Sequence, residues 1–391
     1  MNIAILGFGT VGSGVYEIIQ HAATDEVKNL HVTHILIRKG KDKTLPIMCD
    51  DIQTILDDPQ VDLVVETMGG IEPAHTYIMD AIQAKKHVVT ANKAVVAKYL
   101  KDFNAAASNN DVHFYYEAST GGGIPWIQGL EKTLRIDPVD CIHGIFNGTS
   151  NYILDHMYRY QATFDDVLKD AQHLGYAEAD PSADIDGFDI CNKIRISASI
   201  AYNHPITDQF PIFGIRNILK EDVQFFSSKE FVVRLIAKTK RKGNTYGCVV
   251  EPMLFGKNQI EANVQENYNL ISLHGDTIGE LKFYGQGAGK LATANAVIQD
   301  IIDISENKSH RQCSFNHTMQ YDSTLCNHDY ILRCNPSLQS LFKELEYEPI
   351  AHSYFHIKHV EVTKMHAILK EILECDPTAF MASIYEEEQS C

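Results

Sequence analysis

The chain has 391 residues, of which 45% are hydrophobic, so it is long enough for two or three domains with packed cores. Its 34 basic and 51 acidic side chains give a net charge of −17, which argues against nucleic acid or an anionic membrane as a partner. No apolar run approaches the roughly 18 residues of a membrane span, and no signal peptide precedes the first predicted strand. Nine cysteines lack C-x-x-C pairs and metal-ligand spacing, so we expect a cytoplasmic protein with reduced thiols.

The first residues, MNIAILGFGTVG, predict a buried strand followed by a glycine-rich turn. Residues 3–6 form an apolar run, the glycines that follow match G-x-G-x-x-G, and the next segment has helical spacing. The first glycine permits a tight turn, the second lets backbone approach a pyrophosphate, and the third lets helix and strand pack closely. The pattern predicts a dinucleotide site formed by Gly7, Phe8, Gly9, Thr10, Val11 and Gly12.

The second predicted strand ends in Arg38 and Lys39, where an NAD-selective site usually has an acidic residue for the ribose. Cations at this point favour the 2′-phosphate of NADP, although NAD remains possible. The alternative is that both residues are simply exposed basic side chains on a loop.

Strand-like runs alternate with helical patterns up to residue 125, at 61–70, 87–97 and 113–125. This alternation predicts an α/β fold with a doubly wound parallel sheet of the Rossmann type. Ligands of such sheets lie beyond the carboxyl ends of the strands, where Thr67 and Lys93 fall.

Residues 175–193, GYAEADPSADIDGFDICNK, place five carboxylates in front of Lys193. Asp189 and Lys193 are four residues apart, so on a helix they lie one turn apart on the same face. A lysine among acids at the start of an apolar helix suits an amine or carbonyl substrate. A capped surface helix with an exposed ion pair is the alternative.

Seven motifs resemble those of homoserine dehydrogenases and run in the same order: GFGTVGSGV, VVETMGG, HVVTANKAVVA, EASTGGGIP, GIFNGTSNYIL, AQHLGYAEADPSADIDGFDICNK and YGQGAGKLATANAV. Together they extend over residues 1–305. The resemblance implies reversible, NAD(P)-dependent interconversion of L-aspartate-4-semialdehyde and L-homoserine, on the route to threonine, methionine and isoleucine.

The resemblance also implies roles for individual residues. Lys193 matches the family's proposed proton donor, and Lys93 matches a second lysine near the nicotinamide and the substrate. Aldehyde reduction generates an alkoxide-like oxygen, which a positively charged donor stabilises and can protonate. Glu178 and Asp189 match the residues that bind the amino acid end of homoserine. Further cofactor contacts are expected at Thr67, Lys93, Ser119, Gly175 and Gly287.

The glycine-rich segment 117–125 leaves backbone carbonyls accessible beside one carboxylate, a set that suits a weakly held hard cation. The family has a sodium site here. Carried over, its ligands are Glu117 and the carbonyls of Thr120, Gly122 and Ile124. Valine is usual at position 120, but a backbone ligand should tolerate threonine. A glycine turn shaped only by packing is the alternative.

Three domains are expected. Residues 1–130, completed by 286–306, would bind the dinucleotide, and residues 131–285 would form an α+β substrate-binding and dimerisation domain. Residues 328–391 have the ferredoxin-like element order of an ACT regulatory domain in degenerate form. Because the loop 335–338 lacks the glycine expected there, we predict weak or no inhibition by threonine, and a tail that helps a homodimer or homotetramer to assemble.

Two other functions remain open at this point. One is a different lysine-dependent NAD(P) oxidoreductase acting on amino acids, such as a deaminating dehydrogenase. The other is a non-catalytic NADP-binding regulator with the same fold. The presence of Lys93, Glu178, Asp189 and Lys193 argues against the regulator, because a binding module would not need them.

Overall fold

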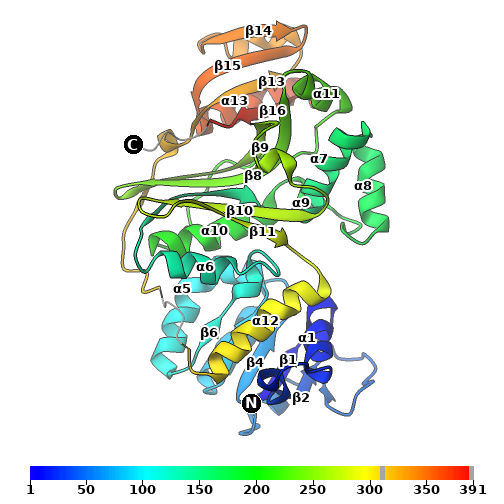
Figure 1. Cartoon of the computed structure of the whole chain (residues 1–391), viewed down its shortest axis with the longest axis vertical. Coiled ribbons are helices and arrows are strands. Elements are labelled where there is room, and N and C mark those ends of the chain that lie inside the picture. Colours follow the sequence, from blue (N-terminus) through cyan, green and yellow to red (C-terminus); the bar gives the residue numbers. More distant parts are fainter. Residues whose placement is uncertain (309–312, 387–391) are drawn as a thin grey trace. The chain divides into compact units, whose positions relative to one another are not determined.

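The computed structural model describes residues 1–308 and 313–386, which form two compact units (Figure 1). Unit 1 contains residues 1–137, 195–207 and 285–317, and unit 2 contains residues 138–194, 208–284 and 318–391. Each unit is assembled from segments far apart in the sequence. In the described part of the chain, no helix combines the length and apolar character needed to cross a membrane.

Unit 1 is built on a sheet of six short strands: β1 (Asn2–Leu6), β2 (His31–Leu36), β3 (Met48–Cys49), β4 (Leu63–Glu66), β5 (His87–Thr90) and β6 (Phe114–Tyr115). Their order is β3-β2-β1-β4-β5-β6, and every pairing is parallel. This is the strand order of dinucleotide-binding sheets, and the order reverses between β1 and β4. The predicted doubly wound Rossmann-type sheet is confirmed.

Helices pack on this sheet: α1 (Thr10–Gln20), α2 (Asp25–Lys28), α3 (Gln53–Leu56), α4 (Ala74–Gln83), α5 (Lys93–Asn110), η1 (Glu117–Ser119), α6 (Trp126–Thr133) and α12 (Lys290–Ser305). Val297 and Ile301 of α12 belong to the same buried core as Ile3 and Ile5 of β1. Helix α12 lies against α1, where a Cβ at Gly14 would be 2.7 Å from the carbonyl oxygen of Lys290 (Figure 1). A helix distant in sequence therefore completes the core of unit 1.

Unit 2 is built on a mixed sheet: β7 (Val139–Ile145), β8 (Phe231–Lys242), β9 (Thr245–Gly256), β10 (Tyr268–Gly275), β11 (Gly279–Gln286), β12 (Gln320–Tyr321), β13 (Asn327–Arg333), β14 (Tyr347–Ala351), β15 (Tyr354–Glu361) and β16 (Phe380–Ile384). The order is β11-β10-β7-β8-β9-β16-β13-β15-β14, and β12 also pairs with β9. The parallel pairings in this sheet are those of β9 with β12 and β16.

The helices of unit 2 are α7 (Gly148–Tyr160), α8 (Phe164–His173), α9 (Ser182–Ile185), α11 (Lys220–Ser228) and α13 (Val362–Cys375), with short 3-10 segments η2 (Glu261–Asn263), η3 (Ser323–Leu325) and η4 (Pro336–Leu341). Helix α10 (Phe188–Tyr202) begins in unit 2, and its residues from Arg195 onward belong to unit 1. Ile194, Ile196 and Ile200 on this helix are all fully buried, as expected for a helix that is apolar on most sides.

The C-terminal tail has the predicted ferredoxin-like element order, with strands arranged β16-β13-β15-β14. The segment η4 replaces its first helix. The tail belongs to unit 2 and is not a separate body, because β16 pairs with β9 at Ser383↔Met253 and Ile384↔Leu254. The prediction that the tail helps a dimer or tetramer to assemble assumes that its apolar strands need a partner. The same chain supplies one partner strand, because β9 covers the edge of β16.

A buried glutamate of β9 also forms hydrogen bonds to the tail. Glu251 of β9 lies 3.1 Å from Nδ1 of His328 on β13 and 2.8 Å from Nε2 of His366 on α13. The Tyr330 hydroxyl donates to the same carboxylate at 3.3 Å. Burial raises the pKa of Glu251, but the hydrogen bonds from both histidines outweigh it and hold the pKa at about 2. The ionised carboxylate therefore stabilises the folded tail.

We predict that Glu251→Gln lowers the free energy of unfolding by about 1–3 kcal/mol, because it removes a buried charge from its hydrogen-bond donors. A carboxyl group with a depressed folded-state pKa stabilises fully above its unfolded pKa of about 4.3, and that contribution is lost as the pH falls toward 2. Denaturant unfolding of both proteins at several pH values checks this: the difference should shrink below about pH 4.5.

The matched control is Glu348→Gln, which removes an exposed glutamate that faces His356 at 3.2 Å. It should leave stability nearly unchanged, because exposed ion pairs contribute little. Equal losses of unfolding free energy in the two variants would contradict the conclusion that the buried Glu251 carboxylate stabilises the folded tail.

Candidate active site

The glycine turn after β1 has the geometry that a pyrophosphate site requires. Gly7 has φ +94°, and a Cβ at Gly12 would lie 2.1 Å from the Gly7 carbonyl oxygen. A Cβ at Gly9 would meet no atom within 4 Å, so space remains on that side of the turn. The N-cap residue of α1 is Gly9, which has no side chain to cap the helix, so among the described residues the first amides of α1 remain available to an anion. The turn fits a dinucleotide.

The neighbouring strand ends support this turn. The Thr67 hydroxyl donates to the carbonyls of Leu6 and Gly7 at 3.1 and 3.0 Å, which links the end of β4 to the turn. The Gly7 amide donates to the carbonyl of Leu36 at the end of β2. Arg38 and Lys39 follow that strand and are exposed. The two cations therefore extend from the same sheet edge as the glycine turn.

Lys93 is the first residue of α5 and is partly buried. Asn92 caps this helix, because its side chain accepts from the Val95 amide at 3.3 Å. A cation at a helix N-terminus opposes the helix dipole, so helix stability does not explain a lysine here. Its position at the carboxyl end of β5 is where a parallel sheet binds its ligands.

Lys193 lies in a buried polar cluster of unit 2. Its Nζ donates to the Phe146 carbonyl at 2.6 Å and to Asp189 Oδ2 at 2.8 Å. The side chains of Lys193 and Asp189 are 9% and 5% exposed, so the pair is not the exposed surface pair of the alternative interpretation. The predicted spacing of one helical turn is present, and the pair is removed from bulk water.

Asn147, which the sequence argument did not single out, organises this cluster. Its Nδ2 donates to Asp189 Oδ2 at 2.8 Å and to Asp184 Oδ1 at 2.7 Å. Its Oδ1 accepts from the Ser150 amide at 2.8 Å and so caps α7. The motif GIFNGTSNYIL contains Asn147, and its N-cap pattern before a helix was the available signal.

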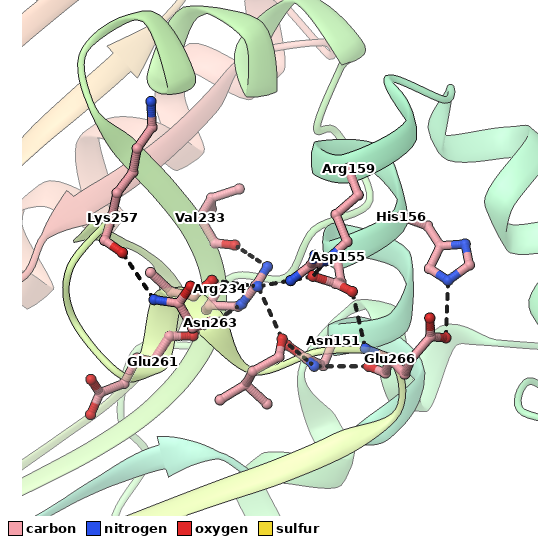
Figure 2. A network of polar contacts seen from close by, with 12 residues as sticks. Asn151, Asp155, His156, Arg159, Val233, Arg234, Lys257, Glu261, Asn263 and Glu266 are labelled. Carbon is pink, nitrogen blue, oxygen red and sulfur yellow. Dashed lines mark hydrogen bonds and ion pairs between the residues drawn. The ribbon is translucent and has the colours of Figure 1, made fainter.

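Helix α7 is held by a buried arginine network (Figure 2). Arg234 of β8 is fully buried and donates to Asp155 Oδ1 at 3.2 Å and to the Ala262 and Val264 carbonyls at 2.9 and 3.0 Å. Asn151 on α7 donates to the Val264 carbonyl at 3.2 Å. Burial lowers the pKa of Arg234 to about 10, although Asp155 opposes this. The network fixes α7, whose first turn follows Asn147.

Two other predicted residues of unit 2, Gly175 and Glu178, lie in the segment that follows α8. Glu178 is exposed, and its recorded hydrogen bond is that of its carbonyl with the Gln172 side chain at 3.1 Å. Gly175 follows α8 with φ +75°, which is the left-handed conformation that commonly ends a helix. Gly175 therefore has a structural role at the end of α8.

The segment 117–124 lies in unit 1 against the loop before α12. A Cβ at Gly122 would lie 2.4 Å from the Gly287 carbonyl carbon, so these two predicted site residues are neighbours. Ser119 is buried, and its hydroxyl has no hydrogen-bond partner among the described residues. The Glu117 carboxylate accepts from the amides of Ile127 and Gln128 at 2.9 and 2.8 Å and so caps α6.

These contacts determine how a cation would fit. Burial raises the pKa of Glu117 to about 7, against the lowering effect of the backbone donors. The Ile124 carbonyl accepts from the Trp126 amide at 2.7 Å, whereas the described structure records no donor to the carbonyls of Thr120 and Gly122. In the described structure the carbonyls of Thr120 and Gly122 therefore accept no recorded hydrogen bond, and the Glu117 carboxylate also caps α6.

A second cluster in unit 2 lines a cavity of about 390 Å³. Ligand atoms of His143, Glu261 and Glu280 lie within 4.8 Å of one another. Lys282 forms ion pairs with both carboxylates, so its ammonium already supplies the positive charge that a metal would bring. Burial raises the pKa of Glu261, but His143 and Lys282 outweigh it and hold the pKa at about 2. We assign this cluster to structural ion pairing.

A Rossmann unit with a glycine turn, followed by a unit with a buried lysine-aspartate pair, is typical of a nicotinamide-dependent dehydrogenase. Family models described as "Homoserine dehydrogenase, NAD binding domain" and "Homoserine dehydrogenase" match residues 7–117 and 125–302. The chain belongs to the homoserine dehydrogenase family.

Individual relatives agree with this assignment. The chain is 40% identical to a homoserine dehydrogenase of Synechocystis over 316 residues, which are 78% of this chain and 73% of the relative. A crystal structure of a Thiobacillus denitrificans homoserine dehydrogenase is similar over 99% of this chain and 98% of that chain, with 30% identity and a TM-score of 0.86. A hyperthermophilic archaeal homoserine dehydrogenase in complex with NADPH is similar over 79% of this chain and 98% of that chain, with 26% identity and a TM-score of 0.69.

The glycine turn yields a prediction that separates folding from binding. Gly9→Ala should leave the melting temperature unchanged, because its Cβ meets nothing, yet weaken NADPH binding at least about tenfold by intruding on the pyrophosphate. Gly12→Ala should lower both the melting temperature and the affinity for NADPH, because its Cβ collides with Gly7. Thermal unfolding and NADPH fluorescence titration measure the two effects.

Gly256→Ala is the control, since its Cβ would meet its nearest neighbour at an ordinary 3.7 Å. It should change neither measurement. Unchanged NADPH affinity in a folded Gly9→Ala variant would show that the cofactor does not lie on this turn.

Proposed function

We propose that the chain catalyses the reversible, NAD(P)-dependent reduction of L-aspartate-4-semialdehyde to L-homoserine, a step toward threonine, methionine and isoleucine. The observation that carries this proposal is the buried ion pair of Lys193 with Asp189 in a homoserine dehydrogenase family member. Isolated buried charges are costly, so a paired lysine in a substrate unit indicates a use for its proton and its charge.

Each residue has a defined task in this proposal. The bound nicotinamide cofactor supplies the hydride. Lys193 gives a proton to the substrate oxygen and stabilises the negative charge that develops there. The Phe146 carbonyl and Asp189 orient its ammonium group. Asp189 and Glu178 bind the substrate ammonium, and Lys93 acts as the second lysine near the reacting groups.

Lys193→Ala tests this assignment. We expect kcat with L-homoserine to fall by a factor on the order of 10² to 10⁴, because the group that exchanges a proton with the substrate oxygen, a general base in this direction, is lost, while NADPH affinity changes little. Steady-state kinetics and NADPH titration supply both numbers. The control is Lys169→Ala, an exposed lysine on α8, which should keep full activity. Near-normal kcat in folded Lys193→Ala would overturn the role of proton donor.

We also propose that NADP is the preferred cofactor and that NAD is usable. The support is the exposed pair Arg38 and Lys39 beyond the end of β2, at the sheet edge that carries the glycine turn. A guanidinium matches the geometry of the 2′-phosphate that distinguishes the two cofactors.

Arg38→Ala should therefore raise the Kd for NADPH by about tenfold or more and leave the Kd for NADH nearly unchanged. Fluorescence titration with both reduced cofactors measures the difference. Lys41→Ala, another exposed cation on the same loop, is the control and should change neither value. Equal weakening of both cofactors by Arg38→Ala would exclude a contact with the 2′-phosphate.

A sodium ion at residues 117–124 is a further part of the proposal. The carbonyls of Thr120 and Gly122 support it best, since the Glu117 carboxylate and the Ile124 carbonyl have hydrogen-bond donors already. Backbone oxygens suit a hard, weakly held cation. The full set of four ligands stays a prediction, and the ion would be structural.

The tail is proposed to be an ACT-like assembly element that responds weakly or not at all to threonine. Its first loop has few donors to offer a carboxylate: the Asn335 amide donates to Asp376 at 2.9 Å, the Ser337 amide to the Asn335 side chain at 3.0 Å, and Pro336 has none. A homodimer or homotetramer in the cytoplasm stays our expectation for the assembled enzyme.

A further inference from the structure

Glu66, the last residue of β4, is a fully buried carboxylate at the ligand-binding edge of the Rossmann sheet. Its Oε2 lies 2.6 Å from the Thr90 hydroxyl at the end of β5. Its Oε1 lies 2.7 Å from the Met68 amide and 3.5 Å from the Asn92 side-chain nitrogen. These recorded partners are all neutral groups, which is unusual for a charge so deeply buried.

The directions of the hydrogen bonds indicate which protonation state of Glu66 fits the site. The Thr90 hydroxyl accepts from the Asn92 amide at 3.0 Å, so its single proton is left to point at Glu66. The other contacts are N–H groups, which can only donate. Each recorded contact therefore offers a hydrogen to Glu66, and an acceptor-only carboxylate satisfies them all. Burial raises the pKa of Glu66 above its ordinary value, and these donors offset only part of that rise.

The same carboxylate joins two loops that carry proposed site residues. One loop follows β4 and begins with Thr67, which binds the Gly7 carbonyl. The other is the turn from β5 to α5, in which Asn92 donates to the Gly70 carbonyl at 2.7 Å and caps the helix that Lys93 begins. A shift at Glu66 would move both loops.

We propose that Glu66 is a positioning residue that holds Lys93 and the nicotinamide end of the cofactor in register, and that its buried negative charge favours the oxidised cofactor. The inference rests on the proposed function. The oxidised nicotinamide ring is cationic and the reduced ring is neutral, so a fixed anion at this edge distinguishes the two by charge alone. Loop capping by itself would not require a charged group, because neutral acceptors can serve the same donors.

Glu66→Gln tests both parts, because it keeps the shape and one acceptor oxygen while removing the charge. We expect a cooperative thermal transition, a Kd for NADP⁺ that rises about tenfold more than the Kd for NADPH, and a kcat lower by a factor on the order of 10 to 100. Calorimetric titration of the apoprotein with each cofactor gives the two Kd values without any turnover. The control is Glu72→Gln, which changes an exposed glutamate beyond the same loop. It should alter neither the ratio of the two Kd values nor kcat.

A second variant separates charge from position. Thr90→Val removes the shortest hydrogen bond to Glu66 but keeps the carboxylate, so kcat should fall while the ratio of the two Kd values stays that of the wild type. This variant also provides the test of position if Glu66→Gln does not fold. Normal kcat in folded Thr90→Val would overturn the positioning role.

Equal weakening of NADP⁺ and NADPH by Glu66→Gln would overturn the electrostatic role. A lower melting temperature with unchanged kcat and unchanged Kd ratio would mean that Glu66 only supports the fold. Failure of the proposed function looks different, since the wild type would then bind NADPH but not oxidise L-homoserine, and the Kd ratio would still report on Glu66.

Discussion

The proposed chemistry depends on a lysine that is buried, paired with a carboxylate and oriented. Removing an ammonium from water costs several kcal/mol, and one carboxylate compensates for this only when further hydrogen bonds complete the site. Lys193 has both, from Asp189 and from the Phe146 carbonyl. Asn147 then fixes the carboxylate from the other side. Removing any of these partners would leave a buried charge insufficiently compensated.

This arrangement requires that helix α7 and the strands that support it are rigid. Asn147 caps α7, and the helix is in turn anchored by the buried guanidinium of Arg234 through Asp155. Residues far from the reacting groups therefore hold the first turn of α7 in place. Preorganisation of this kind lowers the cost of orienting a proton donor at the moment of reaction. In unit 1, Thr67 and Glu66 likewise form hydrogen bonds to the loops that they position.

Much of this was predictable from the sequence because the signals are local. The glycine turn and the Asp189 to Lys193 spacing each lie within a short segment, and the alternation of strands and helices predicts a doubly wound parallel sheet. The support of the site is non-local and was not predicted. Arg234 stands in the run FVVRLIAKTK and resembles an ordinary strand cation until its partners on α7 are known. Pairing of β16 with β9 likewise has no sequence signal, since strand partners are chosen by tertiary packing.

The hydrogen-bond partners of Glu117 and Glu66 could be identified only from the positions of their side chains. Glu117 is predicted as a cation ligand, and its carboxylate also caps α6 through two amides that lie ten or more positions away in the sequence. Glu66 ends an apolar run and gave no sign of its four donors, because these come from two different loops, Met68 and Gly69 after β4 and Thr90 and Asn92 at the end of β5. Sequence spacing identifies which residues share a helix face. It does not show which loops converge on a buried acceptor.

The most direct test of the central claim is the initial rate of NADPH formation with L-homoserine and NADP⁺, measured by absorbance against a panel of other L-amino acids. If Lys193 and Asp189 serve an amino acid that carries a terminal alcohol, L-homoserine should be oxidised much faster than the rest of the panel. Oxidative deamination of another amino acid, with no turnover of L-homoserine, would contradict the account.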